Sequence, residues 1–183
     1  ESIELTLWDD YLVAGNSLYL EHEGTAPIVF VGNGIYDPAQ GINDYAGLDV
    51  TGKYVALLHN APRSLHPDVR AHYMQQKAKM AAAQGALGVF VLLTPQSLEV
   101  FSYDLKKREA LKPLSNWLQS NGEMHDDAPG LGALVYLPPE TSSRMFEGEP
   151  QSFETILQTS EEGAALEAFT LSKKADLAFS FSA

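Results

Sequence analysis

Two short apolar runs, joined by a polar loop rich in glycine, constrain the fold of this chain more than any other feature. The runs are IVFV at residues 28–31 and YVALL at residues 54–58, and neither carries a charge. Such runs, bounded by turn residues, predict buried β-strands. Glycines supply backbone freedom where the joining loop must turn or approach another segment closely. They are Gly32, Gly34, Gly41, Gly47 and Gly52.

A third apolar run, VFVLL at residues 89–93, follows a helical pattern at residues 70–84. Gly85 comes directly after that pattern, as a helix-ending glycine commonly does. Residues 89–93 are uncharged throughout, so we expect this strand to be covered on both faces. Residues 54–93 therefore predict a right-handed β-α-β crossover. The expected inward face of the helix consists of Ala71, Met74, Ala78, Ala81 and Ala82.

Weaker patterns predict the remaining elements. Alternating residues at 3–7 and 18–20, with a turn near Asn16, predict antiparallel strands at a sheet edge. Residues 96–128 are polar and irregular, with a short helix expected from Pro113 and anchored by Trp117. Further on we expect a strand at 132–137, short helices at 141–146 and 152–158, and strands at 169–171 and 176–181.

Composition excludes several classes of function. A net charge of −12 argues against nucleic-acid binding, because a phosphate-binding surface needs clustered lysine and arginine. The only basic cluster, KKR at residues 106–108, is typical of a solvated helix face. The absence of cysteine excludes disulfides, thiol catalysis and thiolate metal sites. No apolar run approaches the ~20 residues of a membrane span, and the start at Glu1 favours a fragment of a longer protein.

Residues 27–59 resemble the core signature of the protease-associated domain, which is inserted in zinc-dependent aminopeptidases of the di-zinc exopeptidase family. In that family a strand ending in G-x-G leads to a polar loop, an aspartate-tyrosine pair, G-x-D-V-x-G-K and a second strand. The resemblance is strong for residues 27–95, weaker for 132–181 and absent for 96–128. The matching segments are GNG at 32–34, Asp44 and Tyr45, GLDVTGK at 47–53, the strand from Tyr54, and GALGV at 85–89.

The resemblance implies an α/β fold of the swivelling β/β/α type, with mixed strands in two small, partly barrel-like sheets and helices packed on one side. Residues 1–183 would form a single domain, with edge strands in 1–26 and 165–183 leading from and to a missing catalytic domain. The implied role is non-catalytic: to gate or orient a peptide substrate beside a di-zinc centre. The zinc would belong to the missing domain of an exported protein, extracellular or periplasmic, and this chain would hold no cofactor.

A motif at residues 125–130, H-x-D-x-x-G, matches the first metal-binding motif of the same enzymes. It would use His125 as a zinc ligand and Asp127 as the bridge between two zinc ions. However, a polar segment precedes it where a buried strand is needed, and no histidine follows His125. The pair Glu161-Glu162 mimics the enzymes' glutamate pair but is typical of a solvated helix end. We therefore expect no catalytic or metal site. We also expect His59, His66 and His72 to be scattered surface or hydrogen-bonded histidines rather than a metal cluster.

The remaining candidates concern binding. Polar residues on the loop between the two core strands can reach a partner, and two more follow the second strand. An alternative favoured by the pattern is that Asp44 and Asp49 bond to turn amides and hold the loop in shape. The candidate contacts to substrate or partner are Asp37, Asn43, Asp44, Tyr45, Arg63 and His66.

Two other functions stay open at this point. The chain could be a stand-alone protein-interaction module that binds through an exposed strand edge. It could also be a small metal-dependent hydrolase that uses His125 and Asp127.

Overall fold

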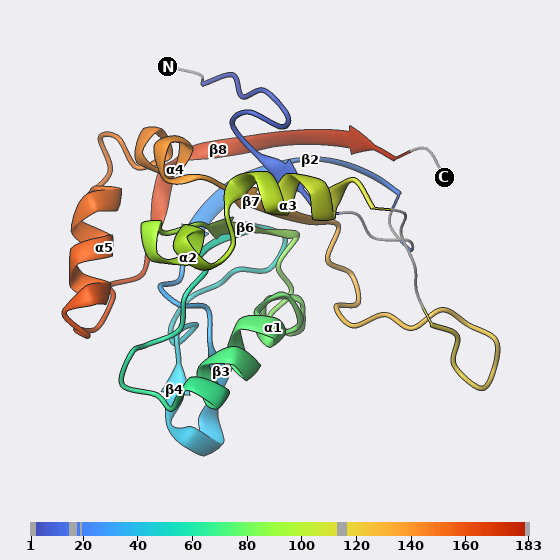
Figure 1. Cartoon of the computed structure of the whole chain (residues 1–183), viewed down its shortest axis with the longest axis horizontal. Coiled ribbons are helices and arrows are strands. Elements are labelled where there is room, and N and C mark those ends of the chain that lie inside the picture. Colours follow the sequence, from blue (N-terminus) through green and yellow to red (C-terminus); the bar gives the residue numbers. More distant parts are fainter. Residues whose placement is uncertain (1–2, 15–17, 19, 113–116, 182–183) are drawn as a thin grey trace.

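The computed structural model describes residues 3–14, 18, 20–112 and 117–181, and it has an α/β fold (Figure 1). A mixed six-stranded sheet curls strongly into a half-barrel, with the strand order β1-β7-β6-β5-β2-β8. Its four central strands run parallel, and β1 and β8 pair antiparallel at the two edges. The strands are β1 (Leu12–Val13), β2 (Glu21–Phe30), β5 (Tyr54–Leu58), β6 (Gly88–Leu92), β7 (Ala133–Leu137) and β8 (Phe169–Ser180).

Smaller elements complete the described part of the chain. A two-stranded ribbon, β3 (Tyr36–Asp37) with β4 (Ile42–Asn43), encloses a 3-10 turn at Pro38–Gln40 and lies on the loop between β2 and β5. None of the helices in the described residues has the length and apolar character that a bilayer crossing requires. The helices are α1 (Pro67–Ala83), α2 (Pro95–Val100), α3 (Tyr103–Ala110), α4 (Pro139–Met145) and α5 (Phe153–Glu161).

The strands predicted from the three apolar runs are confirmed. Every residue of β5 and β6 is buried, and the two strands pair in parallel from Tyr54 opposite Gly88 to Leu58 opposite Leu92. Helix α1 connects them, so the predicted β-α-β unit is present. Uncharged, fully buried strands belong in a sheet that is covered on both faces, which is what this chain builds.

Helix α1 begins three residues earlier than expected. Its predicted inward face is confirmed for Ala81, which is buried, and for Met74, Ala78 and Ala82, which pack against the core. Pro67 occupies its first turn and His66 is its N-cap, while Gly85 follows its end with a φ of 81°. The buried stripe is Tyr73, Lys77 and Ala81, one residue on every turn. Ala71, also predicted on the inward face, is exposed, because it lies in the first turns of the helix, before the buried stripe begins at Tyr73.

The helices cover both faces of the sheet, so the expectation of helices on one side is wrong. Inside the curl, Phe146 after α4 and Phe153 and Ile156 of α5 pack against inward side chains such as Phe30 and Tyr54. On the outer face, Ala81 of α1 packs with outward side chains of the same strands. Parallel central strands present two apolar faces, and each face needs its own cover.

The N-terminal segment differs from its prediction. Residues 3–7 form no strand, and the sheet edge is instead β1, which pairs with β7. The turn expected near Asn16 lies outside the described residues, as does most of the helix expected from Pro113. Apart from that helix, the sequence predicts no element in residues 96–128. In the structure this stretch contains most of α2 and all of α3, followed by a loop that projects from the body (Figure 1).

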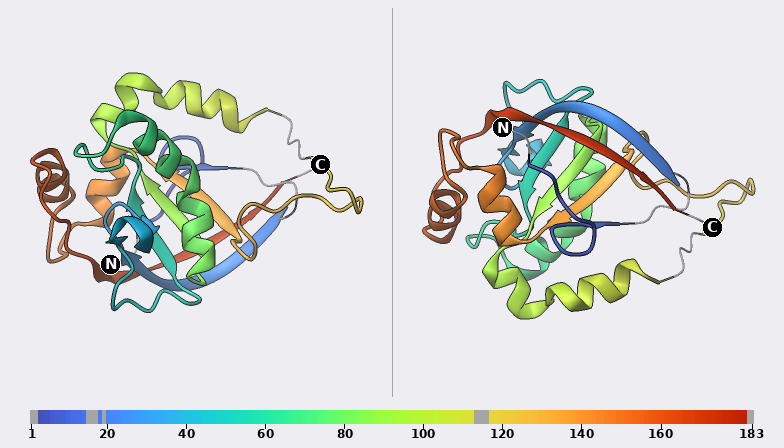
Figure 2. Two further views of the ribbon diagram at one scale, coloured as in Figure 1. Left: turned by 90° about the horizontal axis from the view of Figure 1, so that it is seen from below. Right: turned by 90° about the horizontal axis from the view of Figure 1, so that it is seen from above.

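The C-terminal strand predictions are confirmed, but as one strand. β8 runs through 12 residues without interruption and pairs with β2 from Glu21 opposite Ser180 to Phe30 opposite Phe169. The two strands lie side by side along their whole length and form the long curved edge of the half-barrel (Figure 2). A single shift of register between Pro27 and Val29 accommodates the proline, which has no amide hydrogen to donate.

Candidate functional site

Polar side chains gather at the carboxyl ends of β5 and β6, next to the loop that follows β2. Carboxyl ends of parallel strands meet at one edge of a sheet, and open α/β sheets commonly bind ligands there. In this chain the edge is built by the residues that directly follow the two buried strands and by the middle of α1. The members of this cluster, which we call the strand-end cluster, are His59, Asn60, Lys77 and Thr94.

Lys77 is the most deeply buried charged side chain of the cluster. Its Nζ donates hydrogen bonds to the carbonyl oxygens of Leu58 at 2.7 Å and Asn60 at 2.6 Å. Burial lowers the pKa of Lys77 to about 7, and the nearby carboxylate of Asp44 offsets part of this effect. The amine therefore ties the middle of α1 to the end of β5.

Asn60 extends the cluster toward α2 and the surface. Its Nδ2 donates to Thr94 Oγ1 at 2.8 Å and to Gln96 Oε1 at 3.3 Å. Thr94 caps α2 through a reciprocal pair of bonds with Ser97, so the acceptor position is fixed. Exposed Arg63 donates to the same Gln96 oxygen at 3.2 Å, which links this predicted contact residue to the buried cluster.

His59 is held as a neutral imidazole. Burial lowers its pKa to about 4, and the positive charges of Lys106 and Lys77 act in the same direction. Among the described residues its Nδ1 has no hydrogen-bond partner, and the same is true of Asn33 Oδ1 after β2. A neutral imidazole can accept a proton or a hydrogen bond, but the described residues place no nucleophile within hydrogen-bond distance of Nδ1.

The predicted loop residues are brought together, mainly by bonds within the loop. Asp44 Oδ2 accepts the amide of Ile35 at 2.9 Å, and burial raises the pKa of Asp44 although this bond and Lys77 oppose the rise. Asn43 Oδ1 accepts the amide of Tyr45 at 3.0 Å. Asp49 Oδ1 accepts the amide of Thr51 at 3.1 Å. The interpretation that Asp44 and Asp49 bond to turn amides is confirmed.

Asp37 and His66 bond to residues of α1. Asp37 Oδ2 accepts the hydroxyl of Tyr73 at 2.8 Å, which joins the ribbon to α1. His66 Nδ1 accepts the amide of Asp68 at 3.4 Å, and its ring is exposed at the start of α1. Tyr45 is buried, with its hydroxyl 3.5 Å from the carbonyl oxygen of Gly34. Contact of these residues with a substrate or partner stays a prediction.

The H-x-D-x-x-G motif lies in the projecting loop, away from the strand-end cluster (Figure 1). His125 Nε2 lies 2.8 Å from Asp127 Oδ1, and the imidazole stacks on Trp117 with 4.1 Å between ring centroids. In the described part of the chain, no three histidine or carboxylate side chains are grouped so as to hold a metal ion. Glu161 ends α5 and Glu162 caps it, both exposed, as expected of a solvated helix end.

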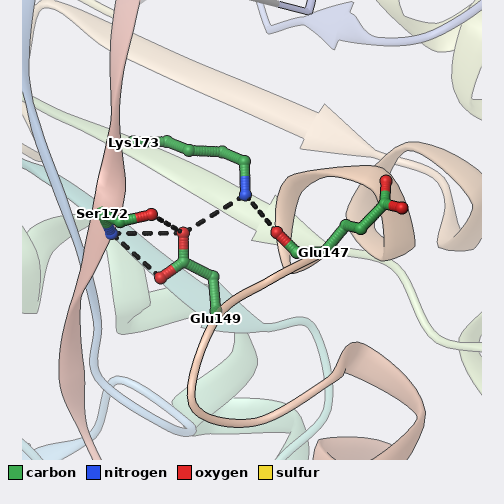
Figure 3. Close-up of polar contacts among 4 residues, drawn as sticks. All are labelled: Glu147, Glu149, Ser172 and Lys173. Carbon is green, nitrogen blue, oxygen red and sulfur yellow. Dashed lines mark hydrogen bonds and ion pairs between the residues drawn. The ribbon is translucent and has the colours of Figure 1, made fainter. Parts of the chain in front are cut away.

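Two polar groups were missed by sequence reasoning. The sequence spacing of Lys77 could have shown that it is buried. It lies four residues from both Tyr73 and Ala81, so the three share one face of a helix that packs on the sheet. The second group surrounds Glu149, whose carboxylate accepts the amide of Ser172 at 2.9 Å and its hydroxyl at 2.7 Å, with Lys173 Nζ at 3.3 Å (Figure 3). No local pattern joins residues 23 or 24 positions apart, so this group had no sequence signal.

Comparison of the chain with known proteins gives no match to a family model, to a curated protein or to a solved structure.

Proposed function

We propose that this chain is a non-catalytic protease-associated module of a zinc-dependent aminopeptidase, which gates or orients peptide substrate at a neighbouring active site. The observation that carries the proposal is the structural use of the signature residues. Asp49 accepts the Thr51 amide and pairs with Lys53 Nζ at 3.2 Å, and Gly47 and Gly52 have φ values of 72° and 65°. These roles of the aspartate, the lysine and the two glycines in the turn support the proposal.

The pairing of β2 with β8 also supports an inserted module. Glu21 lies opposite Ser180, and Thr25 Oγ1 donates to Asp176 Oδ1 at 2.9 Å. The stretch from β2 to β8 begins and ends on neighbouring strands, while β1, which precedes it, pairs with β7 at the opposite edge. A stretch whose ends lie close together can be carried between two neighbouring points of another domain. The proposal accordingly assigns the swivelling β/β/α fold, with residues 1–183 as one domain and the catalytic domain as its partner in the same polypeptide.

The proposal places chemistry in that partner domain. Zinc would be held there, and the parent would be an exported metallopeptidase, extracellular or periplasmic. The net charge of −12 suits a surface that attracts the positively charged amino terminus of a peptide. Arg63 lies exposed beside the strand-end cluster and His66 is exposed at the start of α1, and in this proposal both contact the peptide farther along its chain.

The test compares substrates of different length in the protein encoded by the complete reading frame. An Arg63→Ala variant should raise KM for peptides of several residues by about threefold to tenfold, a loss typical of one exposed contact of ~1 kcal/mol. Hydrolysis of a one-residue aminoacyl anilide should stay unchanged. Lys174→Ala, an exposed lysine on β8, is the matched control and should change neither substrate.

Two results would contradict the proposal. A reading frame without zinc-ligand motifs on either side would favour the stand-alone interaction module, for which the exposed edge of β8 is the natural surface. Stoichiometric zinc in the isolated chain, with anilide turnover abolished by His125→Ala, would instead establish a small metal-dependent hydrolase.

A further inference from the structure

A groove of 270 Å³ lies between α3 and the edge strand β1 with its neighbour β7. Its walls are mostly apolar, with Leu12 and Ala14 on one side and Leu105 and Phe101 on the other. Tyr136 of β7 forms part of the same lining. This volume is near the lower end of ligand pockets, which run from roughly 300 to 1,000 Å³, so it suits a ligand of about ten non-hydrogen atoms.

Lys106 places a cation in this apolar groove. Its Nζ lies 4.8 Å from the ring centroid of Tyr136 and 5.8 Å from that of Phe101. Among the described residues no carboxylate lies within 4.0 Å of this ammonium group, whereas the next lysine, Lys107, pairs with Asp9 at 3.7 Å. Burial lowers the pKa of Lys106, as expected for a cation that lacks a counter-charge.

Two charged neighbours of Lys106 are paired with other groups, Lys107 with Asp9 and Glu109 with Lys112. Residues 106–108 are the only basic cluster of an acidic chain, and the expectation of a solvated face holds for exposed Arg108 but is wrong for half-buried Lys106. Glu109 also lines the groove, but its carboxylate pairs with Lys112. The Lys106 ammonium group therefore has no counter-charge among the described residues, and one anion in the groove could pair with it.

We infer that this groove binds a small monocarboxylate with an apolar body, its carboxylate at Lys106 Nζ and its body against Leu12, Leu105 and Tyr136. The pairing would satisfy a partly desolvated cation, and an ion pair in a water-poor site is stronger than one at the surface. The body would cover the exposed parts of Leu105 and Tyr136, which are only partly buried, whereas Leu12 is already buried. This inference does not depend on the proposed role as a non-catalytic module of an aminopeptidase.

A carboxylate with an apolar body can come from two sources, an aliphatic acid or the C-terminal residue of a peptide. Octanoate represents the first source and N-acetylleucine the second, and each has an uncharged amide of nearly the same shape. Titration of the isotope-labelled 183-residue chain, followed by NMR, should shift the amide signals of α3, β1 and β7. At least one carboxylate should bind about tenfold more tightly than its amide, since one charged contact contributes ~1.4 kcal/mol. The tighter carboxylate identifies the source.

Three variants test the role of the charge. Lys106→Met keeps the apolar stem and should abolish the preference for carboxylate over amide, while Lys106→Arg should retain it. Lys107→Met, the matched control, should also retain it. The inference is overturned if neither carboxylate shifts the amide signals of α3 at a concentration of about 20 mM, which is on the order of the weakest binding that the titration can measure. It is equally overturned if the amides bind as tightly, or if Lys106→Met leaves the preference intact.

Discussion

At the scale of single residues, Lys77 decides how the middle of α1 is held against the sheet. Its ammonium group is fully enclosed and donates to the carbonyl oxygens of Leu58 and Asn60. Those carbonyls belong to the last residue of β5 and to the loop that follows it, and the lysine bonds to them at the cost of its own desolvation. This desolvation lowers the pKa of Lys77, with Asp44 opposing part of the effect, and the lowered pKa makes the stability of the fold depend on pH.

We predict that the free energy of unfolding rises between pH 7 and pH 9. The pKa of Lys77 is lowered to about 7 in the fold, whereas an unfolded lysine keeps its ordinary value near 10.5. Between these values the unfolded chain binds more protons, so raising the pH favours the folded state, by up to about 2 kcal/mol over this range. Urea denaturation at pH 7, 8 and 9 measures it.

Lys77→Met is the matched variant for this pH dependence. Methionine fills a similar volume but cannot titrate, so the variant should lose the rise between pH 7 and pH 9 whatever its stability at pH 7. An equally steep rise in the variant would show that another group titrates in this range. Tyr54 cannot supply the rise, since its pKa is raised to about 12 in the fold, which makes stability fall above pH 10.

At the scale of elements, the start of β8 is protected by a side chain from another segment. β8 is an edge strand, and edge strands expose amides that can pair with other chains. The Glu149 side chain, 1% exposed, occupies the Ser172 amide at this edge (Figure 3). Burial alone would raise the pKa of Glu149, but bonds from Ser172 and the charge of Lys173 outweigh it and lower the pKa.

We predict that Glu149→Ala lowers the free energy of unfolding by about 1–3 kcal/mol, because the Ser172 amide and hydroxyl lose hydrogen bonds to a charged acceptor. Glu149→Gln, which keeps one acceptor oxygen, should lose less. Glu147→Ala is the control, because only the backbone carbonyl of Glu147 takes part, accepting from Lys173 Nζ. Urea denaturation at pH 7 ranks the three, and equal losses for Glu149→Ala and Glu147→Ala would contradict the assignment.

Elements with a local signal were predictable from the sequence. The apolar runs of β5 and β6 and the glycine after α1 depend only on neighbouring residues, so their positions followed directly. The single span of β8 did not, because polar residues interrupt its pattern and only the long pairing with β2 holds it extended. The strand expected at residues 3–7 alternates suitably but has no strand beside it in the described structure.

At the scale of the whole molecule, the sequence could not show how the sheet curls or which residues meet at its edges. Asp44 and Lys77 come close only because β2 and β5 are parallel and α1 crosses back between β5 and β6. The turn-forming role of Asp44 was predictable, since its partner Ile35 is nearby in the chain. The strand-end cluster and the groove at Lys106 depend on contacts between distant segments, which one sequence does not reveal.

We predict that one engineered disulfide can close the long edge of the half-barrel. Glu21 and Ser180 are paired Cα partners, and the chain has no cysteine to interfere. With both changed to cysteine, oxidation should stabilise the fold by about 4 kcal/mol, because the bond closes a very long loop. The melting temperature with and without reductant measures the gain.

The control pair is Glu21→Cys with Phe179→Cys. These residues are one position out of register, so their side chains point to opposite faces of the β2–β8 ladder. They should stay reduced under the same conditions. Crosslinking of both pairs to the same extent would mean that this end of the ladder is not held in register.

The enclosure of Lys77 has one more consequence, which concerns reactivity. An amine whose pKa is about 7 is largely unprotonated in mildly basic solution, and in that form it is a competent nucleophile. The fold keeps it out of reach of any reagent. Acylating agents should therefore label the exposed lysines first and reach Lys77 only when α1 moves away from the sheet. The rate at which Lys77 is labelled would then report the rate of that opening.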